Sequence, residues 1–142
     1  MSEIQTVGIV GAGVIGAGWA ARCLARGYDV IAWDPGPNAE TILVNKIANA
    51  WPALVKIGWA QTPEPPAIRF TDSLEELAKA SDFIQESAPE QIDLKRKLHA
   101  DLDQHAAPHV VIGSSSSGLL PTEIQADCTH PERIIIGHPF NP

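Results

Sequence analysis

Three glycines near the N-terminus have the spacing of a phosphate-binding loop. Gly11, Gly13 and Gly16 form the sequence G-A-G-V-I-G directly after a short apolar run. In such a loop the first glycine permits a tight turn, the second lets the backbone approach a pyrophosphate, and the third allows a helix to pack closely on a strand. The phosphates would lie on the helix N-terminus at Val14 and Ile15, where backbone N–H groups have no partner within the helix.

A carboxylate follows this loop at the distance where a ribose-binding acid is expected. Asp34 lies 18 residues after Gly16, at the end of a second apolar run, and the typical distance is ~20 residues. A carboxylate there accepts hydrogen bonds from the adenosine ribose and repels a 2′-phosphate, so it favours NAD over NADP. The alternative is an ordinary turn acid before Pro35 and Gly36, because Asp is common in turns. We expect NAD as the cofactor, with FAD as its main rival, since the same fingerprint binds both.

The elements that must position these residues are short apolar runs separated by helical stretches. The runs do not alternate with polar residues, as is typical of strands that are buried on both faces of a parallel sheet. We therefore predict a Rossmann-type, doubly wound, mainly parallel six-stranded sheet with helices on both faces. The predicted strands are Thr6–Val10, Asp29–Trp33, Ile68–Phe70, Phe83–Gln85, Val110–Gly113 and Ile134–Gly137.

The first two helical stretches differ in how clearly they end. Val14–Arg26 should end at Gly27, a residue suited to the left-handed cap position, and Gly18 within it is expected to serve helix packing. Ala39–Gly58 contains Pro52, which should kink or split the helix because proline removes a backbone donor.

The two later helical stretches have a cap and an amphipathic pattern. Ser73 and Glu76 have the spacing of a capping box for a short helix ending near Ala80. The stretch Ile92–Ala106 is predicted to be an amphipathic surface helix. Its apolar residues are Ile92, Leu94, Leu98 and Leu102, and its opposite side carries Asp93, Lys97 and Asp101.

The composition is that of one globular domain over residues 1–142. The chain is 44% hydrophobic and 19% charged, and its length suffices to bury one core. A formal net charge of -7 removes the attraction that nucleic-acid binders use. No apolar run approaches the ~20 residues of a membrane span, and the N-terminus lacks the features of a signal peptide. We expect a cytoplasmic protein with neither a nucleic-acid nor a membrane partner, and two cysteines, Cys23 and Cys128, are too few for a disulfide framework or a metal site.

Three segments of the chain resemble the 3-hydroxyacyl-CoA dehydrogenase family. They are Asp82–Glu90 (DFIQESAPE), Ser114–Pro121 (SSSSGLLP) and His138–Pro142 (HPFNP). A serine run followed 21 residues later by His-x-x-Asn-Pro is not a general feature of dinucleotide-binding folds. The resemblance implies the NAD-binding half of an oxidoreductase that oxidises a 3-hydroxyl to a 3-keto group by hydride transfer to NAD.

The resemblance also implies the roles of five residues. His138 would remove the hydroxyl proton while hydride leaves the same carbon, a task that suits imidazole because it accepts and returns protons near neutral pH. Its place just after a predicted strand is suitable, because ligands of open α/β sheets bind beyond the carboxyl ends of strands. Ser117 would hydrogen-bond the substrate oxygen, and Asn141 would orient substrate and nicotinamide. Glu90 and Lys95 match positions that contact the nicotinamide-side ribose.

Structural explanations compete with these roles. The serine run could be a turn that satisfies its own backbone, and Lys95 could lie on a solvated helix face. The remaining histidines are interpreted as surface or core residues: His99, His105, His109 and His130.

The resemblance implies further parts beyond Pro142. The family's histidine is paired with a glutamate shortly past this motif, and a helical second domain completes the substrate pocket and much of a dimer interface. We expect these parts outside this chain, in a parent protein that forms a homodimer.

The substrate stays open between classes. Coenzyme A needs cations, and between Asp34 and Phe70 the chain offers only Lys46, Lys56 and Arg69, which favours a small 3-hydroxy substrate without coenzyme A. A 3-hydroxyacyl-CoA, such as 3-hydroxybutyryl-CoA, and a gulonate-type hydroxy acid are the alternatives. A non-catalytic NAD-sensing module is a further possibility, although a sensor needs no base at the nicotinamide end.

Overall fold

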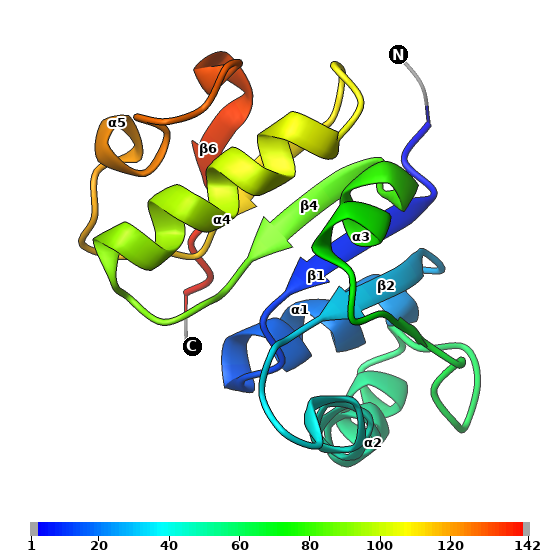
Figure 1. The fold of residues 1–142 in the computed structure, drawn as a ribbon. Helices are drawn as coiled ribbons and strands as arrows, with labels where there is room; N and C mark the ends of the chain where they lie inside the picture. Colours follow the sequence, from blue (N-terminus) through cyan, green and yellow to red (C-terminus); the bar gives the residue numbers. More distant parts are fainter. Residues whose placement is uncertain (1–2, 141–142) are drawn as a thin grey trace.

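The computed structural model describes residues 3–140 and contains a six-stranded parallel sheet with helices on both faces (Figure 1). The strand order is β3-β2-β1-β4-β5-β6, which confirms the predicted doubly wound fold. The strands are β1 Thr6–Val10, β2 Asp29–Trp33, β3 Arg69–Phe70, β4 Phe83–Glu86, β5 Val111–Ser114 and β6 Ile134–Ile136. The last four differ from the predicted bounds by one residue at one end or, for β5, at both ends. The order reverses between β1 and β4, so a crevice opens beyond their carboxyl ends.

Helices cover the two faces of the sheet over separate hydrophobic clusters. They are α1 Val14–Ala25, α2 Ala39–Lys56, α3 Leu74–Ala80, α4 Ile92–His105 and α5 Pro121–Ile124, and a 3-10 turn, η1, spans Pro131–Arg133. The cluster under α1 and α2 includes Ile9, Leu43 and Trp51. The cluster under α3, α4 and α5 includes Ile84 and Leu102. None of the helices in residues 3–140 is long and apolar enough to cross a membrane.

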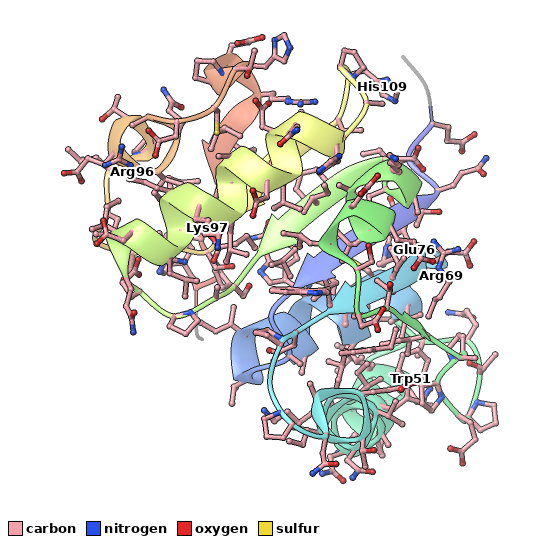
Figure 2. The ribbon with its side chains drawn as sticks, in the orientation of Figure 1. Trp51, Arg69, Glu76, Arg96, Lys97 and His109 are labelled. Atoms are coloured by element: carbon pink, nitrogen blue, oxygen red, sulfur yellow. The ribbon has the colours of Figure 1, made fainter. Side chains whose placement is uncertain are left out.

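Helix α2 runs through Pro52 without a break, so the predicted split is wrong. Proline leaves the carbonyl of Ala48 without its helical donor, but Ala48 and Pro52 are both exposed and water can bond to that carbonyl. The neighbouring Trp51, labelled in Figure 2, is buried, and its indole N–H donates to the carbonyl of Thr62 at 2.9 Å. This bond ties the following loop to α2.

Glycine and cap positions in the helices are confirmed in part. Gly27 has φ +86°, the left-handed conformation expected at the end of α1. Ser73 Oγ accepts from the backbone N–H of Glu76 at 3.2 Å, but the Glu76 carboxylate accepts from the Thr71 hydroxyl, so only half of the capping box forms. Gly18 is exposed and an added Cβ would meet no atom within 4 Å. Its predicted packing role is therefore wrong.

Helix α4 is amphipathic, but its inward face is not purely apolar. Leu98 and Leu102 are buried, and Lys97, labelled in Figure 2, is exposed. Lys95, His99 and Asp103 are buried as well. Asp103 accepts from Arg133 Nε at 2.7 Å, and this pair fixes the turn that leads into β6.

Candidate active site

Backbone hydrogen bonds place the loops after four strands side by side at the carboxyl edge of the sheet. Gly11 N–H donates to the carbonyl of Trp33, and Ser87 N–H donates to that of Val10, both at 2.8 Å. Further along the edge, Ser115 N–H donates to Glu86 and Gly137 N–H donates to Ser114, also at 2.8 Å. The glycine loop, the serine run and the segment before His138 therefore share one edge.

The three glycines of the loop are not all required for the same reason. Gly11 has φ +105°, and a Cβ there would lie 2.8 Å from the carbonyl oxygen of Ser87. A Cβ on Gly16 would lie 1.8 Å from the carbonyl oxygen of Gly11, so both positions need glycine for the protein's own packing. Gly13 differs, because a Cβ there would meet no atom within 4 Å. The space over Gly13 and the N-terminus of α1 is open to a ligand.

The start of α1 is exposed and carries no cap from a side chain. The N-cap is Gly13, which has no side chain that could cap the helix, and no acidic residue occupies the first turn. The side chains of Val14 and Ile15 are 80% and 47% exposed. The free N–H groups and the positive end of the helix dipole favour an anion at this position.

Asp34 lies at the end of β2 and faces the glycine loop. Its Oδ2 accepts from the backbone N–H of Ala12 and its Oδ1 from that of Gly36, both at 2.7 Å. The turn interaction with Gly36 is thus real, but the same carboxylate also contacts the glycine loop. Asp34 lines a cleft of about 340 Å³ together with Gly13 and Ala88, and its oxygens keep lone pairs for further donors.

A buried charged cluster lies beneath this edge. The Glu86 carboxylate is fully buried and accepts from Lys95 Nζ and Ala88 N–H at 2.6 Å each. It also accepts from Ser114 Oγ at 2.6 Å and lies 3.0 Å from His99 Nε2. Burial alone would raise the pKa of Glu86, but the hydrogen bonds from His99, Lys95 and Ser114 outweigh it and lower the pKa to about 2. Glu86 therefore holds α4 and the ends of β4 and β5 together as an ionised group.

We expect this cluster to make the domain sensitive to acid. Because the pKa of Glu86 falls from 4.5 to about 2 on folding, its contribution, about 3 kcal/mol, is complete above pH 4.5 and is lost as the pH falls toward 2. Urea denaturation of the wild type and of Glu86→Gln at pH 7, 4 and 3 measures it. The variant should lose less stability than the wild type between pH 7 and 3, and an equal loss would contradict the assignment.

Lys95 does not lie on a solvated helix face. It is 1% exposed, and its ammonium group contacts Glu86 and donates to the carbonyl of Ala88 at 3.1 Å. It lies under the loop that carries Glu90. Two of its three N–H groups are engaged by these contacts, which leaves one for a further acceptor.

The serine run is largely structural, with one exception. Ser114 and Ser115 hydroxyls contact Glu86 and Ser87, and the Ser116 hydroxyl donates to Glu90. Ser117 is exposed, its backbone N–H donates to Glu90 Oε2 at 3.1 Å, and its hydroxyl forms no hydrogen bond within residues 3–140. The turn explanation therefore fits Ser114–Ser116, while the Ser117 hydroxyl is free to bind a ligand.

His138 is exposed just beyond β6 and borders a cleft. Its ring contacts Phe140 edge to face, with ring centroids 5.3 Å apart. The cleft, about 540 Å³, also borders Val14, Ile15 and Arg22 of α1, so the proposed base and the proposed phosphate site open onto one space. Asn141 lies outside the described residues. Among the other histidines His99 is in the core, and His105, His109 and His130 are partly or fully exposed, as predicted.

Gln85 and the Glu86 cluster were missed by sequence reasoning. Gln85 is fully buried, and its Nε2 donates to Ser115 Oγ at 2.8 Å and to the carbonyl of Gly137 at 3.0 Å. It links the serine run to the residue before His138. A signal for the cluster was available, because Lys95 and His99 lie four residues apart and so share one side of α4.

Comparisons with known proteins identify the family of this chain. A model of the family described as 3-hydroxyacyl-CoA dehydrogenase, NAD binding domain, matches residues 6–142. The chain is 56% identical over 142 residues to L-carnitine dehydrogenase of Pseudomonas aeruginosa and 49% identical over 142 residues to that of Burkholderia mallei. Both alignments include 100% of this chain and 44% of the relative. It thus spans less than half the length of these relatives.

Two solved structures are similar to this chain over 99% of its length. The 3-hydroxybutyryl-CoA dehydrogenase from Escherichia coli matches with a TM-score of 0.85 and 27% identity, over 99% of this chain and 30% of that chain. The (S)-3-hydroxybutyryl-CoA dehydrogenase from Ralstonia eutropha matches with a TM-score of 0.83 and 31% identity, over 99% of this chain and 50% of that chain.

Proposed function

This chain belongs to the 3-hydroxyacyl-CoA dehydrogenase family as its NAD-binding domain, and from that premise we propose that it serves the NAD-dependent oxidation of the 3-hydroxyl of L-carnitine. The observation that carries the proposal is the cleft that His138 shares with the N-terminus of α1. The choice of L-carnitine is supported by the names of the relatives that are 49% and 56% identical to the chain.

The residues at the carboxyl edge fit NAD. Gly13 leaves room for a pyrophosphate over the exposed start of α1, and the Asp34 carboxylate lies beside the glycine loop, where it can accept from ribose hydroxyls. Glu90 and Lys95 would contact the nicotinamide-side ribose, Glu90 from the surface and Lys95 through its remaining N–H group. NAD bound there would supply the hydride acceptor.

The chain's own residues would handle the proton and the substrate oxygen. A ring nitrogen of His138 takes the proton of the 3-hydroxyl as the C–H bond gives up its hydride, so the carbon becomes a ketone. Ser117 Oγ donates a hydrogen bond to that oxygen. Gln85 and Glu86 hold the loops that carry these two residues. Asn141 would orient the substrate beside His138.

Three further expectations from the sequence extend this proposal. They are that residues 1–142 form one cofactor domain, that a helical second domain with the partner glutamate of His138 belongs to the complete enzyme, and that this enzyme is a cytoplasmic homodimer. The relatives' greater length supports a second domain. Light scattering of the full-length gene product measures the assembly.

NADH formation by the full-length gene product tests the proposed function. With saturating NAD we expect turnover of L-carnitine, and kcat/KM for 3-hydroxybutyryl-CoA and for gulonate should be at least about 100-fold lower, because the site discriminates through its polar contacts. A preference for either competitor would replace L-carnitine with that substrate. If the protein binds NADH but oxidises none of the three substrates, the NAD-sensing alternative is favoured.

A further inference from the structure

The cleft beside His138 continues along α1 to a cation that the cofactor site does not use. It passes Gly18 and Trp19 and ends at Arg22, while His138 and Phe140 form its other side. Gly18 carries no side chain that could obstruct the passage, and the space over its Cα is open. This explains a glycine that helix packing does not require.

Arg22 is held in place but has no anionic partner in residues 3–140. Its guanidinium lies over the ring of Trp59, with Cζ 4.1 Å from the ring centroid, and it forms neither a side-chain hydrogen bond nor an ion pair there. Stacking occupies the face of a guanidinium and leaves the N–H groups at its edge free for a bidentate acceptor. The residue is exposed, so an anion can approach it from the cleft.

We propose that Arg22 binds the free carboxylate of the substrate and thereby makes the site selective for small hydroxy acids over acyl-CoA thioesters. The inference rests on the proposed function, because it places the substrate hydroxyl at His138. Arg22 lies one helical turn beyond Gly18, about 6 Å along the axis, and long helical side chains point back toward the N-terminus. Because Arg22 and His138 border the same cleft, an anion in that cleft can reach the free N–H edge of the guanidinium. In L-carnitine a single methylene separates the hydroxyl-bearing carbon from the carboxylate, whereas a thioester has no charge at that position.

Steady-state kinetics of Arg22→Met in the full-length gene product test the inference. Met keeps the length of the side chain and removes its charge. The substrates are L-carnitine and its primary amide, which keeps the quaternary ammonium group but lacks the carboxylate charge. We expect kcat/KM for L-carnitine to fall about 10- to 100-fold, mainly through KM, because a charged hydrogen bond is lost, and kcat/KM for the amide to change less than about threefold. Arg22→Lys should restore part of the loss, since it returns the charge without the bidentate geometry.

Arg26→Met is the matched control, because Arg26 is exposed on the following turn and does not border the cleft. It should leave both substrates and the NADH affinity unchanged. If the wild type oxidises L-carnitine and Arg22→Met keeps its preference for L-carnitine over the amide, the inference is overturned while the proposed function stands. If the wild type prefers gulonate and Arg22→Met loses it, L-carnitine is wrong but the carboxylate role is supported. Turnover of the thioester alone overturns both.

Discussion

Replacing His138 with glutamine should lower kcat for L-carnitine oxidation by about 10²- to 10⁴-fold, the contribution typical of a general base. Glutamine keeps a polar side chain of similar reach but cannot take up the hydroxyl proton. The affinity for NADH should stay within about twofold, which is about 0.4 kcal/mol, because the proposed phosphate and ribose contacts come from Gly13, the start of α1 and Asp34, which the substitution leaves unchanged. Stopped-flow NADH formation and a fluorescence titration measure the two quantities.

His109→Gln is the matched control for this prediction. His109 is also exposed, but it lies in the loop before β5, away from the carboxyl ends of the strands (Figure 2). It should retain wild-type kcat. Retained turnover in His138→Gln would assign the proton to another group and remove the central residue of the mechanism.

Replacing Gly13 with valine should abolish cofactor binding and leave the fold intact. The backbone of Gly13 has φ -69° and ψ -170°, a conformation that valine adopts readily, and its side chain would enter open space. That space is where the pyrophosphate must approach the N-terminus of α1. Loss of two or more hydrogen bonds from backbone N–H to phosphate, about 1.5–3 kcal/mol each, should weaken NADH at least about 100-fold.

A thermal melt beside the NADH titration separates binding from stability in this variant. The Tm of Gly13→Val should lie within about 3 °C of the wild type, because no contact is lost. Gly16→Val is the contrasting variant, since its Cβ would overlap the carbonyl of Gly11, and it should melt much earlier. If Gly13→Val binds NADH normally, the loop is only a turn.

The sheet and the glycine loop could be predicted because their signals are local. Apolar runs such as Thr6–Val10 identify strands on their own, and the glycine spacing directly after β1 identifies the loop. Asp34 and His138 could also be predicted as site residues, because each follows a predicted strand and the carboxyl ends of parallel strands meet at one edge.

The support beneath the site could not be predicted, because it depends on contacts between distant segments. Glu86 meets Lys95, His99 and Ser114 only after β4, α4 and β5 have packed. For Lys95 the sequence left open a position on a solvated helix face, because a lysine on an amphipathic helix usually faces water. Gly18 was misjudged for a similar reason, since the sequence does not show that His138 and Phe140 lie across a cleft from it.

Calorimetric titration of residues 1–142 with NADH and with NADPH tests the central claim most directly. The open glycine loop, the start of α1 and Asp34 all lie within this chain, so we predict that NADH binds with one site per chain. NADPH should bind at least about 10-fold more weakly, because its 2′-phosphate meets the Asp34 carboxylate in place of a hydroxyl donor. Absence of NADH binding, or equal affinity for NADPH, would contradict the account.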